Sequence, residues 1–367
     1  MKKQISVALL LAWAAVCCLA GASEAVKFRY EDLGTLGGNQ EFPGFDLKEL
    51  GINDLGQVVG FSHTATGDLQ AFVKSPGQDM QALPLSAGTI RSHAAGINHS
   101  GLISGWYEDK YTHACKWEPG PPYQVSNLDY DNSVWAYGLN DAGYLVGTGL
   151  GSDSHYHAYA FLPGGGKKDL GTLSGHITSG ARGINKANTI VGFSEDNSSV
   201  PTACVWFYSG EGVWAAAASL FGVADSKAIS INTSGQAVGF TNAHALYLSN
   251  GVLKGVLQSP GKELQYLEGP DPSHKVLPYD INDSGWIVGY TDMFGGERAF
   301  LWTSTGGLQD LNNLVVNLPS GVSLKHAMAV NQRGEIAGYM QKNGVNFSGV
   351  FKLTPIIPLP NSMLLLD

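Results

Sequence analysis

One short phrase occurs seven times along this chain of 367 residues, and it constrains the fold more than any other feature. Each copy has an apolar residue, Asn, two turn residues, Gly or Asn, three mostly apolar residues and a final Gly, at residues 52–60, 97–105, 139–147, 184–192, 231–239, 281–289 and 330–338. Successive asparagines are 45, 42, 45, 47, 50 and 49 residues apart. This period is typical of propellers, solenoids and other repeat arrays, so we expect one repeat body rather than several unrelated domains.

Each copy predicts two strands joined by a tight turn. The Asn side chain can accept a hydrogen bond from the backbone two residues later, and the Gly three residues after Asn suits the left-handed position of a three-residue hairpin. The fourth copy has Asn188 at that position, and Asn is the non-glycine residue that best tolerates positive φ. The final Gly of each copy predicts a close backbone approach or a β-bulge.

A third strand is expected after a variable loop in each unit, because small, apolar and aromatic residues run over about five positions before a turn signal. These segments are 71–74, 113–117, 157–161, 202–206, 244–248, 298–302 and 348–351. A looser fourth strand follows, clearest at 168–173 and 308–311. Each unit is therefore predicted to hold four strands.

The two ends of the repeat array complement each other. Residues 28–38 form a fourth-strand phrase with no hairpin before it, while the seventh unit ends at its third strand near Leu353. Joining these two ends would remove exposed sheet edges. We therefore predict an all-β fold, a seven-bladed β-propeller of four-stranded antiparallel blades with the N-terminal strand completing the last blade. The alternative is an open β-solenoid, although solenoid turns are usually shorter and no polar capping repeat is evident.

Three motifs together carry a family resemblance: Asp-Leu-Gly-Thr-Leu-Gly-Gly at 32–38, the repeated Ile-Asn-x-x-Gly, and His-Ala-aromatic phrases such as His157-Ala158-Tyr159. On these motifs the chain resembles the HAF-repeat proteins, a family of bacterial proteins expected outside the cell. The resemblance covers nearly the whole mature chain. It implies an exported repeat protein, and it supplies no agreed activity and no catalytic residues.

The termini are interpreted separately from the fold. Lys2 and Lys3, an apolar stretch over 5–20 and small residues near 20–25 are the parts of a secretory signal, so we expect a signal peptide at 1–25 and a secreted protein. The stretch is too short for a membrane span. The propeller domain is expected over 26–355, followed by a short tail at 356–367. This tail begins like a proline-containing sorting signal, and degenerate, truncated and strand-end interpretations stay open.

Composition agrees with many short strands and tight turns, since the chain has 48 glycines and 14% charged residues. A formal net charge of −9 disfavours nucleic acid as a partner. Cys115 and Cys204 occupy equivalent positions two blades apart, too far for a disulfide. Histidines 113, 157 and 244 recur at the start of third strands, which favours a repeated structural role over metal binding. We expect no metal, no cofactor and a monomer.

Aromatic side chains in the loops are the candidates for ligand binding, because rings combine contact area with a polar handle. The predicted ligand-binding residues are Trp106, Tyr107, Tyr111, Trp135, His155 and Tyr156. For Trp106 the competing interpretation is a ring that fills the gap between blades. The loop at 149–159 also holds Ser, Asp and His, yet neighbouring strand positions point to opposite faces and no Gly-x-Ser-x-Gly elbow occurs. No catalytic residue is assigned.

Two function classes stay open. The first is a non-catalytic binding or interaction module that recognises a glycan, a peptide or a cell-surface component. The second is a propeller enzyme acting on extracellular polysaccharide, which would need paired carboxylates facing one channel. Loops after the second strands hold the candidates for such a pair, which are Glu108, Asp109, Asp153, Glu195 and Asp196.

Overall fold

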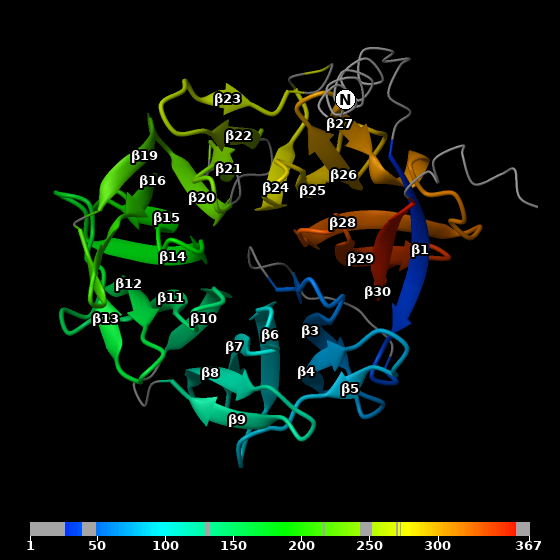
Figure 1. Cartoon of the computed structure of the whole chain (residues 1–367), viewed down its shortest axis with the longest axis horizontal. Coiled ribbons are helices and arrows are strands. Elements are labelled where there is room, and N and C mark those ends of the chain that lie inside the picture. The colour runs from blue at the N-terminus through cyan, green and yellow to red at the C-terminus, as the bar shows by residue number, and fades with distance from the viewer. Residues whose placement is uncertain are drawn as a thin grey trace, which may run out of the picture.

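A computed structural model describes residues 26–38, 49–128, 133–215, 217–242, 252–268, 271 and 273–356. The expected signal segment at 1–25 and residues 357–367 of the expected tail lie outside the described residues. Seven four-stranded antiparallel sheets stand in a circle around a central axis (Figure 1). The predicted seven-bladed β-propeller is confirmed. Within the described residues one 3-10 helix, η2 (Leu311–Asn313), interrupts the strands.

The blades follow one another in chain order, and each runs outward from its first strand. Blade one holds β2 (Gly51–Ile52), β3 (Val58–His63), β4 (Leu69–Lys74) and β5 (Gln81–Ala82); blade two β6 (Arg91–Ile97), β7 (Ile103–Glu108), β8 (Thr112–Glu118) and β9 (Gln124–Asn127); blade three β10 (Val134–Leu139), β11 (Leu145–Leu150), β12 (Tyr156–Phe161) and β13 (Lys167–Asp169). Blade four holds β14 (Thr178–Ile184), β15 (Ile190–Glu195), β16 (Pro201–Trp206) and β19 (Ala218–Ala224), with a small hairpin of β17 (Tyr208–Gly210) and β18 (Val213–Trp214). Blade five holds β20 (Ser226–Ile231), β21 (Ala237–Thr241), β22 (Lys254–Gln258) and β23 (Gln265–Tyr266); blade six β24 (Val276–Ile281), β25 (Ile287–Thr291), β26 (Arg298–Thr303) and β27 (Gly307–Asp310); blade seven β28 (Val322–Val330), β29 (Ile336–Lys342), β30 (Val345–Ile356) and β1 (Lys27–Gly34).

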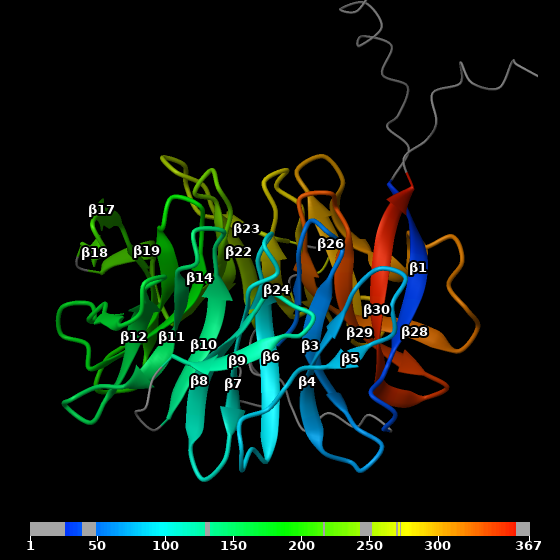
Figure 2. The same cartoon turned by 60° about the horizontal axis from the view of Figure 1, so that its bottom comes forward.

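The antiparallel order gives the ring two different rims. We call the rim that carries the seven Asn-containing turns between first and second strands the turn rim. The opposite rim, formed by the loops between second and third strands, is the loop rim. Lys27 pairs with Ile356, so both ends of the described chain lie together at one edge of the ring (Figure 2). Turns and loops are thus segregated, which separates the repeated part of the surface from the variable part.

The turns have the predicted geometry. In the first, the Gly56 amide donates to the Asn53 carbonyl at 3.0 Å, and the Asn53 amide donates to the Gln57 carbonyl at 3.1 Å. Gly56 has φ 74° and Asn188, its counterpart in blade four, has φ 60°. The glycine rule and its single exception therefore have one cause, a left-handed backbone position in the turn.

The second glycine faces a bulge in six of the seven units, in agreement with the close approach or bulge predicted from the sequence. In six blades the register shifts on the first strand opposite this glycine, for example between Ala94 and Gly96 in blade two. A Cβ on Gly105 would lie 2.0 Å from the His93 carbonyl oxygen. A side chain cannot be accommodated there, because the bulge brings the backbone of the first strand against the second.

The hydrophobic core is divided among the interfaces between blades. Trp117 of blade two packs with Val59 and Val73 of blade one, and Trp302 of blade six packs with Val238 of blade five. Each blade thus buries both faces against its neighbours, which explains the apolar character of both sides of the central strands.

The prediction for the third strand of the fifth unit is wrong. The structure places that strand at β22, where Val256 is fully buried and Leu257 packs toward blade six, whereas the predicted segment 244–248 lies outside the described residues. Both segments carry small and apolar residues at strand spacing. Strand β22 is connected to blade six, where the Val276 amide donates to the Leu253 carbonyl at 3.0 Å.

The ring closes through β1, as predicted. Strand β1 pairs antiparallel with β30, from Lys27 opposite Ile356 to Gly34 opposite Val350. Phe28 is fully buried, and its backbone also exchanges hydrogen bonds with Leu314 and Val316 of the preceding connection. Blade seven is therefore built from both ends of the described chain, which pairs the edge of β30.

None of the described residues forms a helix long and apolar enough to cross a membrane.

Candidate functional site

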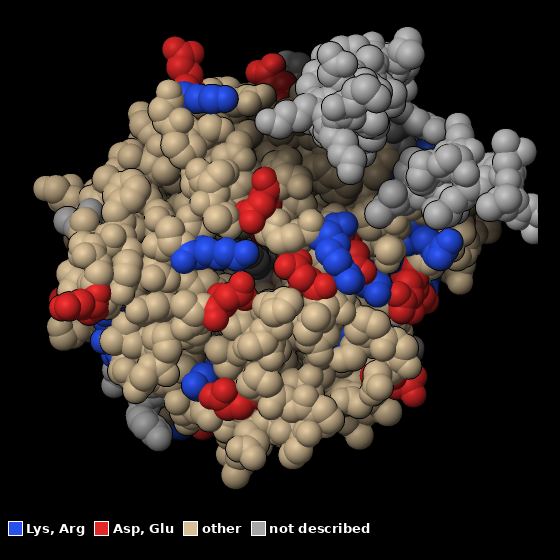
Figure 3. All heavy atoms as spheres, viewed as in Figure 1, with Lys and Arg blue, Asp and Glu red and all other residues tan. Residues whose placement is uncertain are grey.

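The centre of the propeller is hollowed on the turn rim. The depression has a volume of about 190 Å³ and is lined by the seven Asn turns. Its charged lining residues are Asp54, Asp141, Lys186, Asp280 and Asp283. Acidic and basic side chains are seen around the central hollow of the face in Figure 3. A polar, mixed-charge depression on the axis is one of the two surfaces that could contact a partner.

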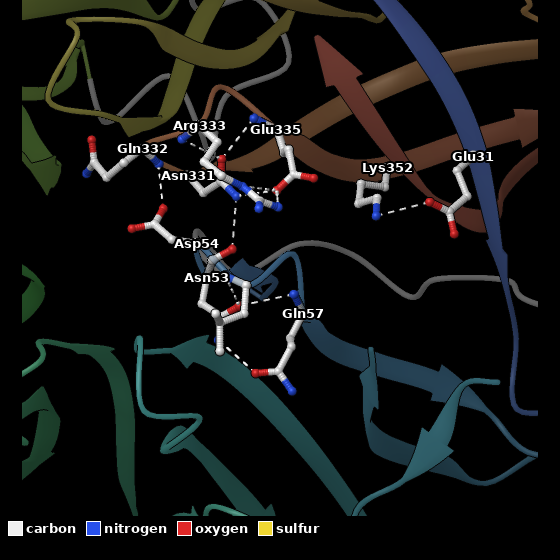
Figure 4. Close-up of polar contacts among 10 residues, drawn as sticks. Glu31, Asn53, Asp54, Gln57, Asn331, Gln332, Arg333, Glu335 and Lys352 are labelled. Carbon is white, nitrogen blue, oxygen red and sulfur yellow. Dashed lines mark hydrogen bonds and ion pairs between the residues drawn. The ribbon is translucent and has the colours of Figure 1, made fainter. Parts of the chain in front are cut away.

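The turn asparagines form a closed ring of hydrogen bonds around this depression. Each side-chain Nδ2 donates to the backbone carbonyl of the corresponding Asn in the next blade, at 2.9 to 3.2 Å. The seven donor and acceptor pairs are Asn53 to Asn98, Asn98 to Asn140, Asn140 to Asn185, Asn185 to Asn232, Asn232 to Asn282, Asn282 to Asn331 and Asn331 to Asn53. Figure 4 shows the last of these, where blade seven meets blade one. The repeated Asn thus holds its own turn and the next blade at once.

The residue after each Asn adds a second, incomplete set of contacts between blades. Asp141 accepts from the His99 amide at 3.0 Å, and Asp283 accepts from the Thr233 amide at 2.8 Å. Asp54 accepts from the Gln332 amide at 2.8 Å. These carboxylates therefore satisfy backbone N–H groups of neighbouring turns. Their place next to the turn Asn is explained by these contacts between blades.

Asp280 lies deeper in the same hollow, where most blades present a small residue at the equivalent position: Gly51, Gly96, Gly138, Gly183, Ser230 and Ala329. Its Oδ1 accepts from the Ser230 hydroxyl at 2.7 Å, and its Oδ2 accepts from the Val330 amide at 3.0 Å. Among the described residues no group of three or more His, Cys, Asp or Glu side chains is arranged to hold a metal ion.

Two of the predicted ligand-binding residues are buried between blades. Trp106 is 4% exposed, stacks on His93 with ring centroids 4.9 Å apart, and meets the Tyr137 ring edge-on at 5.4 Å. Tyr107 is 5% exposed and stacks on His113 at 5.1 Å. The contacts with His93 and His113 lie within blade two, whereas Trp106 meets Tyr137 of blade three and Tyr107 packs with Val59 and Val73 of blade one. Neither ring therefore faces solvent.

Cations continue this packing around the axis. The Arg182 guanidinium lies 4.0 Å from the Tyr137 ring centroid, and Lys227 Nζ lies 3.9 Å from the Phe193 ring centroid. Lys227 also pairs with Glu195 at 3.1 Å. A buried cation is tolerated where a ring face and a carboxylate replace its lost hydration. Glu195, one candidate for a catalytic carboxylate, is thereby paired.

The other four predicted residues lie at the loop rim of blades two and three. Tyr156 is 41% exposed, and its ring centroid lies 5.8 Å from that of the partly buried Trp135. His155 precedes Tyr156 in the same loop, and Tyr111 is 42% exposed in the corresponding loop of blade two. The structure therefore brings the rings of Trp135 and Tyr156 together on blade three, with His155 next to Tyr156 in the chain and Tyr111 on the adjacent blade.

Carboxylates at this rim are held by their own loops. Asp109 accepts from the Tyr111 amide at 2.8 Å and contacts His113 Nε2 at 3.1 Å. The backbone hydrogen bond from Tyr111, assisted by His113, lowers the pKa of Asp109. In blade three the hydrogen bond from the His155 amide, assisted by His157 and His155, lowers the pKa of Asp153. Both carboxylates are therefore ionised acceptors already engaged in loop structure.

The remaining carboxylates proposed for an enzyme are also engaged. Glu108 Oε2 pairs with Arg91 Nε at 2.7 Å. Asp196 Oδ1 accepts from the amides of Ser198 at 2.8 Å and Val200 at 3.0 Å, which forms a tight turn. The loop-rim carboxylates thus contribute mainly to the order of the loops that carry them.

Sequence reasoning missed the Asn ring, although a signal was present. All seven units keep Asn, where Asp or Ser would cap the turn equally well through an acceptor oxygen. Only Asn adds an amide donor. The burial of Trp106 also had a signal in the sequence. An aromatic residue follows the second glycine in six units, and a ring that recurs in this way is better explained by the repeated blade interface than by one ligand.

Comparison with known proteins gives the fold and no family. No protein-family model matches the chain, and a search of curated proteins finds no match. Among solved structures, a puromycin hydrolase is similar with a TM-score of 0.55 and 10% identity, over 90% of this chain and 58% of that one. The BP39L lectin from Burkholderia pseudomallei is similar with a TM-score of 0.50 and 11% identity, over 87% and 98% of the two chains. Virginiamycin B lyase from Staphylococcus aureus matches with a TM-score of 0.48 and 12% identity, over 90% of this chain and 100% of that one. At these identities, the puromycin hydrolase and the lectin show similarity of fold alone.

Proposed function

We propose that this protein is an exported, non-catalytic binding module whose ligand contacts the loop rim over blades two and three. The observation that carries the proposal is a cluster of exposed large side chains on neighbouring loops. Tyr111 and Tyr156 are joined there by Ile90, which is 67% exposed, and by Leu150, which is 39% exposed. Leu150 pairs directly with Tyr156 across β11 and β12, and the Ile90 amide donates to the Glu108 carbonyl. Exposed rings beside polar groups are typical of recognition surfaces.

The engagement of the rim carboxylates favours binding over catalysis. A glycosidase needs one carboxyl group free to donate a proton and a second free to act on sugar or water. Glu108 and Glu195 are paired with cations, and Asp109 and Asp153 accept backbone hydrogen bonds. Their surroundings match a structural role in the loops.

A glycan is the first ligand class to test. Aromatic rings with nearby hydrogen-bonding groups suit the apolar faces and hydroxyls of sugars, and a lectin is among the propellers of similar fold. Export and membership of the HAF-repeat proteins belong to the same proposal, and they rest on the residues of the first 25 positions and on the repeated motifs.

The proposal is tested with the purified protein on a glycan array, beside Tyr156→Ala and the control Phe207→Ala. Phe207 is also exposed, at 54%, and it adjoins the β17–β18 hairpin, whose Trp214 donates to the Asn188 carbonyl on the turn rim. We expect glycan signals that disappear in Tyr156→Ala and persist in Phe207→Ala. Signals that survive Tyr156→Ala would place the ligand elsewhere on the ring, and a blank array would remove the glycan as ligand.

A further inference from the structure

We infer that the loop rim carries two equivalent subsites, one on blade two and one on blade three, and that the ligand is a linear glycan of neutral sugar units spanning both. This inference rests on the proposed function and specifies its ligand. It starts from a loop that occurs twice. Asp109, Tyr111 and His113 in blade two have the same spacing as Asp153, His155 and His157 in blade three.

The two loops share their geometry as well as their spacing. In each, the Asp Oδ1 accepts from the amide two residues later, at 2.8 Å from Tyr111 and at 3.0 Å from His155. In each, the same carboxyl group contacts the histidine four residues later, at 3.1 Å for His113 and at 3.3 Å for His157. The middle residue, Tyr111 or His155, carries a ring in each loop, and the His155 ring also contacts Asp153 through Nδ1 at 3.4 Å.

Other loops at this rim keep only parts of the arrangement, and in blade six Asp292 is followed two residues later by the ring of Phe294 but not by a histidine four residues later. In blade four, Asp196 caps its turn through Ser198 and Val200. In blade one, the Thr64 hydroxyl accepts from the Asp68 amide at 3.2 Å. Of the loops that the structure describes, those of blades two and three alone combine Asp, a ring two residues later and His four residues later. What sets the loops of blades two and three apart is therefore the full combination of Asp, ring and His.

Both rings are available to a ligand on ordered supports. Tyr111 is 42% exposed, and the His155 side chain is 43% exposed. Because the carboxyl groups below them are fixed by hydrogen bonds, little loop ordering is left to be done on binding. The second subsite is extended by Tyr156 and Trp135, whose rings meet at 57°.

Charge balance favours a neutral ligand. Arg91 pairs with Glu108 at 2.7 Å, and Lys110 Nζ lies 5.2 Å from the Tyr111 ring centroid. Glu108 is therefore paired within the surface, while Asp109 and Asp153 remain as carboxylates that disfavour an anionic ligand. Rings and hydrogen bonds remain as the means of recognition, which suits a hydroxyl-rich neutral sugar better than a phosphate-bearing or highly charged partner.

The separation of the two subsites is fixed by the blade interface. The Trp106 ring of blade two packs edge-on against Tyr137 of blade three, and both are buried. The subsites consequently cannot move independently. A repeating ligand that reaches both gains affinity from the second contact without a new loss of translational freedom, whereas a single sugar unit engages one subsite at a time.

The test is calorimetric titration with cello-, chito- and manno-oligosaccharides from disaccharide to hexasaccharide. We expect affinity for at least one series to rise with length by about tenfold or more. Tyr111→Ala and His155→Ala should each reduce the hexasaccharide affinity to the disaccharide level, while Tyr111→Phe, which keeps the ring, and Phe207→Ala should bind like the wild type. Both truncated side chains are exposed, so thermal melts should be unchanged.

Several outcomes would overturn the inference and leave the proposed function standing. These are affinity that does not depend on length, or binding that is lost in Tyr156→Ala and unaffected by Tyr111→Ala. Array signals confined to charged glycans, with none of the three neutral series bound, would also overturn it. A blank array would instead remove the glycan version of the proposed function itself.

Discussion

Asn331 donates a hydrogen bond from its side-chain Nδ2 to the backbone carbonyl of Asn53 at 2.9 Å, although 278 residues separate the two. This contact joins the last turn of the repeat array to the first. The propeller is thus closed twice, at the axis by the Asn ring and at the perimeter by the pairing of β1 with β30. Each closure gives a testable consequence.

The Asn ring should contribute to stability through the amide donor. Asn185 is 6% exposed; its Oδ1 accepts from Ala187 and Thr189, and its Nδ2 donates to the Asn232 carbonyl at 3.1 Å. Asn185→Asp keeps the acceptor and replaces the donor with an oxygen facing that carbonyl. We expect a loss of roughly 1–3 kcal/mol in the free energy of unfolding, measured by chemical denaturation. Asn343→Asp, in an exposed turn, is the control. Equal midpoints for wild type and Asn185→Asp would contradict a role for the ring.

The left-handed turn position should discriminate between side chains. Gly285 has φ 75°, and a Cβ there would have no atom nearer than Gln236 Oε1 at 3.9 Å. There is therefore space for a side chain at this position, and the backbone conformation alone decides how much a substitution changes stability. Gly285→Val should destabilise by about 1–3 kcal/mol because a β-branched residue is forced to positive φ, while Gly285→Asn should be mild, as Asn188 is in blade four. Coincident thermal melts for the two variants would refute the turn assignment.

The N-terminal strand should be essential to blade seven. Phe28 is fully buried against blade six, with the Trp286 ring edge-on at 6.2 Å. Phe28→Ala should cost about 3–5 kcal/mol of unfolding free energy, and loosening of β1 should expose the edge of β30 and promote association. Denaturation and light scattering measure the two effects. Val316→Ala, at a side chain 60% exposed on the neighbouring connection, should change stability by less than about 0.5 kcal/mol. A monomeric Phe28→Ala protein of unchanged stability would exclude closure by this strand.

Acid should weaken the fold through His326. This side chain is 3% exposed and stacks on Tyr290 with ring centroids 4.3 Å apart. Burial lowers the pKa of His326 from its ordinary 6.5, and Glu297 at 3.7 Å offsets only part of that effect. The unfolded chain then binds the proton first as pH falls through about 6.5, so stability is lost below that pH. His326→Gln should flatten the change in unfolding free energy between about pH 7 and pH 5, whereas the exposed control His99→Gln should not. An unaltered slope in His326→Gln would assign the acid sensitivity to other groups.

Prediction from the sequence succeeded where the cause was local. The turn at Asn53 depends on a hydrogen bond within four residues and on one positive φ, so spacing and residue type identified it. It failed for the third strand of blade five, where two segments have similar strand patterns. Residues 244–248 and 254–258 both have a strand pattern, and the structure shows the second as the third strand of blade five, with Leu257 packed toward blade six. The burial of Trp106 and Tyr107 likewise depends on the side chains of adjacent strands and blades.

The sequence by itself determined the unit, its number and its tight turns, because a regular period and a left-handed turn position are properties of short segments. It also determined how the ring closes, because an unpaired strand remained at each end of the array. Only the tertiary structure decided that seven Asn amides link the blades into a circle and that two neighbouring loops present their rings together. Those relationships exist between blades, and their geometry is defined only once the circle is complete.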